Sequence, residues 1–143
     1  MSTSPGANEL AHQLRLTVLR LARRVRAERA DDAMSDGRLS VLFLLANEGA
    51  QTLGSLAEHE RVTPPSMNRT INALVEAELV TRVADARDGR KVVIDLSDAG
   101  SRLVRETRRK RDAWFSSRPA KLSPEERATL EAASPILRRL ADQ

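Results

Sequence analysis

One pair of strand-like segments in an otherwise helical chain limits the fold more than any other feature. The runs LVTRVA (residues 79–84) and VVIDLS (residues 92–97) flank the charged segment DARDGRK (residues 85–91). Short apolar, β-branched runs on either side of a segment with glycine and aspartate predict a β-hairpin. Elsewhere the apolar residues recur at helical spacing. The sequence therefore predicts a mainly α fold with one small β-hairpin, of the α+β class.

Four helices are predicted before the hairpin. The first covers about residues 8–31, and the others cover residues 36–48, 53–60 and 64–77. Thr63 followed by Pro64 is a strong start signal for the last of them, because the hydroxyl caps the helix and proline suits its first position. A short helix, a tight turn, a second helix and a hairpin make a winged helix-turn-helix, which we expect at residues 36–97.

Two helices are predicted after the hairpin. Ser97 or Asp98 should cap a long helix that ends near residue 117, and the capping box SPEE at Ser123 should start the last one. Pro135 predicts a kink in that last helix, since proline removes one hydrogen bond and crowds the preceding turn.

The domain organisation follows from these elements. We expect residues 1–143 to form a single domain in which residues 8–31 and 98–143 flank the winged unit, with residues 1–7 as a loose tail. In the first helix, one apolar stripe holds Leu14, Val18, Leu21 and Val25, and a second holds Leu16 and Leu19. Two stripes predict burial on two sides, for example against the helix's own domain and against a partner chain.

Composition excludes several classes of function. The net charge of +4 favours a polyanionic partner, and the absence of cysteine excludes disulfides, cysteine–zinc sites and thiol redox sensing. His12 and His59 have no partner one helical turn away, and no nucleophile–base pair or phosphate loop is present. We therefore expect neither an enzyme nor a metal or cofactor. No signal peptide or membrane span is predicted, which indicates a cytoplasmic protein.

The helix at residues 64–77 has one apolar and one polar side. Met67, Ile71 and Leu74 share the apolar side. Arginine and asparagine side chains on the other side are suited to read base edges in a major groove, although an ordinary solvated face has the same pattern. The candidate DNA contacts of this helix are Thr63, Pro65, Ser66, Asn68, Arg69 and Asn72.

The hairpin tip carries more charge than a surface turn needs. Arg90 is the candidate for insertion into a minor groove, where negative potential is focused. Asp88 is placed to orient that guanidinium through a charge-assisted pair, and Arg87 and Lys91 would lie near phosphates. The alternative is a solubilising hairpin with surface ion pairs of little energetic value.

The segment DARDGRKVVIDLSDAG (residues 85–100) resembles the wing signature of the multiple-antibiotic-resistance repressor (MarR) family. The family pattern is an aspartate, then Arg-Asp-x-Arg, an apolar strand, and Leu-Ser/Thr with a glycine opening the next helix. The matching residues are Asp85, Arg87, Asp88, Arg90, Leu96, Ser97 and Gly100. Residues 52–82 resemble the helix-turn-helix of the same family, so the similarity covers about residues 39–100.

Two positions depart from the family pattern. The turn between the two helices usually holds an apolar residue and a glycine, and this chain has Glu60 and Arg61 there. A glycine usually precedes the Leu-Val that starts the wing, and this chain has Glu78. A left-handed backbone at such a residue would cost roughly 1–2 kcal/mol.

The resemblance implies a homodimer that binds double-stranded DNA at a pseudo-palindromic operator, usually as a repressor released by a small anionic or aromatic ligand. It implies dimerisation through the first and last helices, for which the candidates are Leu14, Val18, Leu21, Leu130, Leu137 and Leu140. It also implies a ligand pocket where the first, second and fifth helices meet, for which the candidates are Arg15, Leu16, Arg38, Leu42, Val104, Arg105 and Arg108.

Two alternatives remain open at the level of sequence. The run RETRRKR (residues 105–111) has a net charge of +4, from five basic residues and one acid. It is either a solvated face or a site that attracts an anionic ligand or DNA phosphate. The alternative to DNA binding is a winged-helix module that contacts an acidic protein partner.

Overall fold

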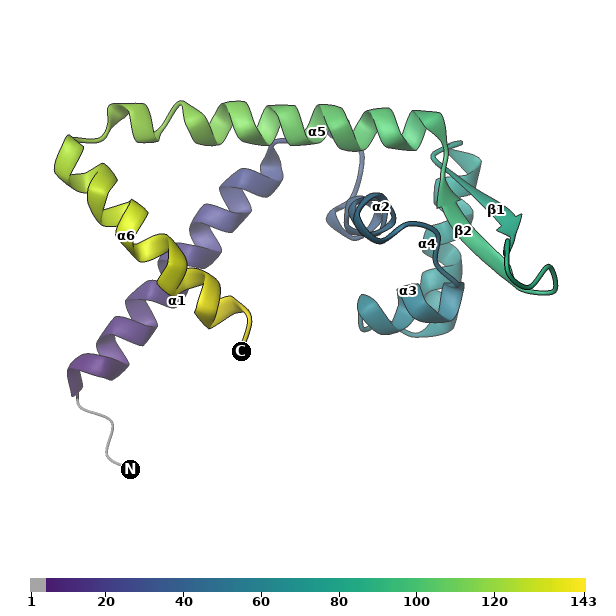
Figure 1. Ribbon diagram of the computed structural model, residues 1–143, viewed down its shortest axis with the longest axis horizontal. Helices are drawn as coiled ribbons and strands as arrows, with labels where there is room; N and C mark the ends of the chain where they lie inside the picture. Colours follow the sequence, from purple (N-terminus) through teal and green to yellow (C-terminus); the bar gives the residue numbers. More distant parts are fainter. Residues whose placement is uncertain (1–4) are drawn as a thin grey trace.

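The computed structural model describes residues 5–143 and confirms a mainly α fold with one two-stranded hairpin. The long helix α5 forms a rod, with the winged helix-turn-helix at one end and helices α1 and α6 at the other (Figure 1). The elements in chain order are α1 (Pro5–Ala27), α2 (Asp36–Glu48), α3 (Leu53–His59), α4 (Pro64–Glu76), β1 (Val80–Ala84), β2 (Val92–Leu96), α5 (Asp98–Ser116), the 3-10 turn η1 (Pro119–Lys121) and α6 (Pro124–Ala141).

The N-terminal boundary differs from the prediction. Residues 1–4 of the predicted loose tail lie outside the described residues, but α1 already begins at Pro5. The expectation of a loose segment was therefore wrong for residues 5–7, which form the first turn of α1.

The other end of α1 was also predicted wrongly, because the helix ends at Ala27 and not near residue 31. Three side chains of α5 bind the backbone beyond that end. Thr107 accepts a hydrogen bond from the Ala30 N–H at 3.1 Å, Arg111 donates to the Glu28 carbonyl at 3.1 Å, and Lys110 donates to the Arg29 carbonyl at 3.2 Å. These bonds pair the backbone N–H and carbonyl groups of residues 28–30, which a further helical turn would otherwise have paired within α1.

The hydrophobic core lies inside the winged unit. Leu42 of α2, Leu56 of α3 and Ile71 and Leu74 of α4 are completely buried, and Ile94 of β2 closes the core beside them. Helix α2 buries five residues, distributed around its axis, which explains its nearly continuous apolar sequence. Burial of large aliphatic side chains contributes about 1.5–3 kcal/mol each, so this unit is where the chain gains most of its stability.

Helix starts match the predicted capping signals. Thr63 accepts from Ser66 N–H at the start of α4, Ser97 rather than Asp98 accepts from Gly100 N–H at the start of α5, and Ser123 and Glu126 form the capping box of α6. Helix α6 continues through Pro135 to Ala141, and the kink predicted at Pro135 stays a prediction.

Candidate nucleic-acid interface

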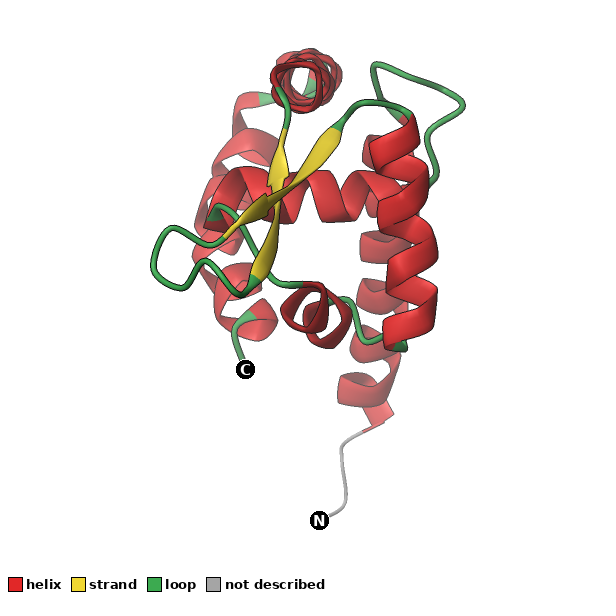
Figure 2. Cartoon of the chain, turned by 90° about the vertical axis from the view of Figure 1, so that its right-hand side faces the viewer, coloured by secondary structure: helices red, strands yellow, loops and turns green. Residues whose placement is uncertain are grey.

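The recognition helix α4 is fixed by its apolar side and leaves its polar side free. Met67, Ile71 and Leu74 are buried, which orients the helix on the core. Among the candidate contacts, the structure leaves five exposed and Ser66 half-buried; the exposed ones are Thr63, Pro65, Asn68, Arg69 and Asn72. Side chains suited to base edges are therefore accessible on α4. Figure 2 views the molecule from its winged end, with the two-stranded wing facing the viewer.

The turn of the helix-turn-helix is left-handed at Arg61, where φ is +55°. This is the position at which the family resemblance expects glycine. Arginine has a Cβ atom that crowds the following carbonyl in this conformation, so the turn stores roughly 1–2 kcal/mol of strain. The turn keeps its shape because the Val62 N–H donates to the Ala57 carbonyl at 3.0 Å and Thr63 caps the next helix.

The junction between α4 and β1 is left-handed at Glu78, where φ is +60°. The start of α5 holds this junction: the Ser97 hydroxyl donates to the Glu78 carbonyl at 2.6 Å, and the Ser97 N–H donates to the Leu79 carbonyl at 3.1 Å. Gly100 faces the same carbonyl of Leu79 so closely that a Cβ atom would overlap it. The Leu-Ser-x-x-Gly part of the wing signature thus fixes the exit of the recognition helix.

The wing is an antiparallel pair in which Val80 lies opposite Leu96 and Ala84 opposite Val92. Its two aspartates shape the loop: Asp85 accepts from the Arg87 N–H at 2.9 Å, and Asp88 accepts from the Arg90 N–H at 3.1 Å. Asx turns of this kind stabilise tight loops. They leave the guanidinium groups of the tip directed to solvent.

The exposed cations of the tip are Arg87, Arg90 and Lys91. The Arg90 side chain is 96% exposed and its Nε lies 3.5 Å from Asp88 Oδ1, which is the pairing predicted from the sequence. An exposed pair of this kind is worth less than about 1 kcal/mol. Arg90 can therefore exchange Asp88 for another anion at little cost.

Arg82 of β1 is a residue that the sequence analysis missed. Its Nη2 donates to Asn72 Oδ1 at 2.6 Å and to Asn68 Oδ1 at 3.4 Å, so it links the wing strand to the exposed side of α4. Sequence reasoning could have found it only from the even spacing of β1, which puts Thr81 and Val83 on one face of the strand and Arg82 on the other.

The basic run at residues 105–111 has a structural role that was not among the two predicted for it, a solvated face or an anion-binding site. Arg111 and Lys110 bind the backbone after α1, as described above, and Arg108 donates to Asn47 Oδ1 of α2 at 2.6 Å. The guanidinium carbons of Arg108 and Arg111 lie 5.3 and 4.9 Å from the centre of the Phe43 ring. Cation–π contacts of this kind add to these bonds, so part of the run fastens α1 and α2 to α5.

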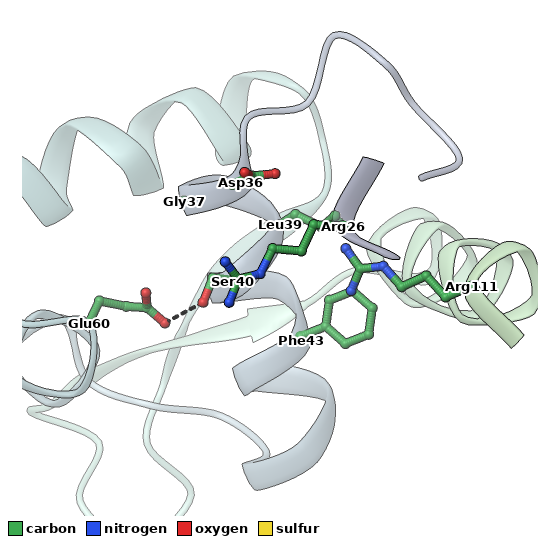
Figure 3. A pocket seen from close by; sticks show the side chains of 8 residues that line it. All are labelled: Arg26, Asp36, Gly37, Leu39, Ser40, Phe43, Glu60 and Arg111. Atoms are coloured by element: carbon green, nitrogen blue, oxygen red, sulfur yellow. Dashed lines mark hydrogen bonds between the residues drawn. The ribbon is translucent and has the colours of Figure 1, made fainter. Parts of the chain in front are cut away.

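A hollow of about 360 Å³ lies between the end of α1, helix α2, helix α5 and the helix-turn-helix turn. Figure 3 shows Arg26 and Arg111 beside it, with Phe43 below Arg111 and a hydrogen bond between Ser40 and Glu60. That bond measures 2.8 Å. The eight residues that line the hollow are Arg26, Asp36, Gly37, Leu39, Ser40, Phe43, Glu60 and Arg111.

The hollow is lined by two cations, Arg26 and Arg111, and two acids, Asp36 and Glu60. Burial lowers the pKa of the Arg111 guanidinium, and the nearby cation Arg29 lowers it further, while Asp36 opposes the shift and Arg26 adds to it. Arginine stays charged, so Arg111 is a partly buried cation with two further arginines, Arg29 and Arg26, close to it. Asp36 is itself paired with Arg29 at 2.7 Å, and only Glu60 adds a second negative charge to this wall.

The predicted ligand residues do not line this hollow. Leu42 and Val104 are core residues, exposed by 0% and 1%. Arg15, Leu16 and Arg38 are exposed. Val104, Arg105 and Arg108 line a second hollow, against Leu45 of α2 and Leu96 of β2. Helical spacing identified the elements that meet but not which turn of each helix faces the space between them.

Helices α1 and α6 carry apolar side chains that the chain itself does not cover. Leu16 and Leu19 of one stripe are exposed, as are Val18 and Leu21 of the other. The expectation that the chain itself covers one stripe is therefore wrong for these four residues, and only Leu14 and Val25 of the first stripe are half-buried. Helix α1 contacts α5, but the winged unit lies at the opposite end of that rod (Figure 1).

The last helix shows the same feature more strongly. None of the 18 residues of α6 is buried. The predicted interface residues Leu130, Leu137 and Leu140 are exposed, as is Ile136, and Leu14 of α1 is half-buried. A contiguous exposed apolar face of this kind marks an interaction surface.

Two further observations concern the described part of the chain. Among residues 5–143, no helix combines the length and apolar character that a bilayer span requires. Within the same residues, no three histidine or carboxylate side chains are grouped as a metal site would need.

The fold and the exposed cations of α4 and the wing define a winged helix-turn-helix protein of the DNA-binding class. The MarR family matches residues 34–92. An HTH-type transcriptional regulator of Mycobacterium tuberculosis is 42% identical over 134 residues, which cover 94% of each chain. The chain belongs to the MarR family of winged helix-turn-helix transcriptional regulators, which are not enzymes.

Solved structures agree with this assignment. A putative transcriptional regulator from Pseudomonas aeruginosa PA01 is 32% identical, covers 99% of both chains and has a TM-score of 0.87. The structure of S. aureus MepR bound to ethidium bromide covers 92% of this chain and 94% of that one, with a TM-score of 0.66. At 19% identity the second likeness concerns the fold alone.

Proposed function

We propose that the protein acts in the cytoplasm as a homodimeric, sequence-specific repressor that a small anionic or aromatic ligand releases from DNA. One α4 helix of each subunit enters a major groove, and one wing of each subunit reaches the flanking minor groove. The observation that carries the proposal is the common exposure of Arg69 on α4 and of Arg87, Arg90 and Lys91 on the wing. Exposed cations at these two places match the charge pattern of a DNA duplex.

The apolar face of α1 and α6 supports the dimer. A helix without a buried residue gains little stability from packing on its own chain, and a second copy supplies the missing cover. A two-fold dimer presents its recognition helices in successive major grooves, so the operator is a pseudo-palindrome with half-sites about one helical turn apart.

The hollow beside Arg26 and Arg111 supports the ligand. Its volume of about 360 Å³ falls in the range of small-molecule sites. The two guanidinium groups offer charge-assisted bonds to a carboxylate or phenolate, and Phe43 offers a ring surface. The ethidium bound to the similarly folded MepR is an aromatic molecule, which agrees with the aromatic half of this proposal.

The route from ligand to DNA runs through Glu60. This residue ends α3 and precedes the left-handed Arg61, and its carboxylate accepts the Ser40 hydroxyl at the edge of the hollow. A ligand that displaces this bond changes the start of the turn that leads to α4. It releases DNA only if it binds the altered arrangement better, and a tenfold loss of affinity needs about 1.4 kcal/mol of difference.

Binding is tested with fluorescence anisotropy of labelled duplexes. We expect an unrelated duplex to bind at low salt with an affinity that falls steeply as salt rises, and selection from a random library to yield a pseudo-palindrome. An acidic protein partner with no affinity for DNA at low salt would contradict the proposal.

Ligand release is tested separately with a salicylate-like series of carboxylates and phenols and with ethidium. Trp114 is the only tryptophan, so its fluorescence and the anisotropy of bound DNA are followed together. The chain has no cysteine, so hydrogen peroxide should not act through a thiol. Release by peroxide, with none by the ligand series, would refute ligand control and leave DNA binding intact.

A further inference from the structure

We propose that Arg82 determines which base Asn72 selects, by holding the Asn72 side-chain amide in one orientation. This inference rests on the proposed function, because it takes α4 as the helix that enters the major groove. Arg82 acts through Asn72 and is therefore a positioning residue.

The contacts of Arg82 define the orientation. Its Nη2 donates to Asn72 Oδ1 at 2.6 Å and to Asn68 Oδ1 at 3.4 Å, and the two hydrogens of that nitrogen serve one amide each. A guanidinium has donors only, so the amide atom that faces it must be oxygen. Both amide NH2 groups therefore point away from Arg82.

This orientation changes what Asn72 reads. A free asparagine amide pairs with adenine by accepting from N6 and donating to N7. Here the Arg82 guanidinium fills one of the two acceptor positions of Asn72 Oδ1 and crowds the approach of an N6 amino group, so the outward NH2 group is the better-placed part for a base. Guanine N7 and O6, thymine O4 and adenine N7 all accept such a donor, but adenine also presents its N6 donor toward the guanidinium, and the cytosine edge offers only its own N4 donor. The expected preference is for guanine or thymine, with adenine disfavoured.

A contact from Arg82 to a phosphate is the competing explanation of any loss of binding. Phosphate contacts lower affinity nearly equally for all sequences and reduce the salt slope by about one. A change confined to one base position per half-site has a different cause. The two explanations are separated by sequence preference and not by affinity.

The experiment is selection from a random duplex library, sequenced deeply, with the wild-type protein and three variants. Asn72→Ala identifies the base position that Asn72 contacts. Arg82→Met keeps an unbranched, somewhat shorter side chain but removes every donor, and we expect the adenine-to-guanine ratio at that position to rise at least about fivefold. Arg69→Ala is the matched control, and it should alter a different position.

Each outcome of this selection either supports or overturns the inference. An unchanged base ratio in Arg82→Met, together with a uniform loss of affinity, overturns the inference in favour of a phosphate contact. If the wild-type protein selects no motif, the proposed function itself fails. If Arg82→Met does not melt cooperatively, Asn72→Asp replaces it. Its carboxylate still accepts from Arg82 but has no donor, so the guanine preference should disappear, and a preference that persists overturns the inference.

Discussion

Replacement of Glu78 by glycine should stabilise the protein, although it deletes a whole side chain. Glu78 has φ of +60°, and a non-glycine residue in this region costs roughly 1–2 kcal/mol. Glycine removes that cost but adds about 0.4–1 kcal/mol of conformational entropy to the unfolded chain. The free energy of unfolding should therefore rise by about 0.5–1 kcal/mol.

The matched control is the same chemical change at Glu106. This residue is exposed in the interior of α5, where glycine is unfavourable by about 0.5–1 kcal/mol. Glu78→Gly and Glu106→Gly should consequently shift stability in opposite directions. Arg61→Gly, at φ of +55°, should behave like Glu78→Gly.

The assay is thermal unfolding followed by circular dichroism at one fixed protein concentration, since the melting temperature of a dimer depends on concentration. We expect a rise of about 2–4 °C for Glu78→Gly and a fall of similar size for Glu106→Gly. A fall for both would refute the reasoning, because it would mean that the Glu78 side chain contributes more than its backbone conformation costs.

Three further predictions concern the wing, the dimer and the α5 start. Arg90→Ala should weaken operator binding by about 1–3 kcal/mol with an unchanged melting temperature, and an unchanged dissociation constant at physiological salt would contradict the assigned role. Leu137→Asp should lower both dimer content by light scattering and DNA affinity, since it places a charge in an apolar face; a wild-type protein that is monomeric at micromolar concentration would rule out the dimer. Gly100→Ala should lower the free energy of unfolding by about 1–3 kcal/mol because its Cβ meets the Leu79 carbonyl. Both glycine variants are measured by denaturant titration, in which Gly54→Ala in α3, where a Cβ meets no atom within 4 Å, should be neutral or stabilising.

Features that depend on neighbouring residues were predictable from the sequence. The capping signals of Thr63, Ser97 and Ser123 act over three residues, and the hairpin follows from two apolar runs around a charged turn. The order of these elements was enough to identify the winged helix-turn-helix. The wing signature then led to the family, because its spacing encodes a loop built by Asp85 and Asp88.

Features that depend on residues far apart in the chain were decided only by the tertiary structure. The end of α1 at Ala27 is imposed by α5, about 80 residues later, through Thr107, Lys110 and Arg111. The bridge from Arg82 to Asn72 and the place of Glu60 on the wall of the hollow have the same origin. Helical periodicity states which side of a helix is apolar, but not which turn meets which neighbour. That choice is made when the core closes, because only then do side chains from separate elements come within hydrogen-bonding distance.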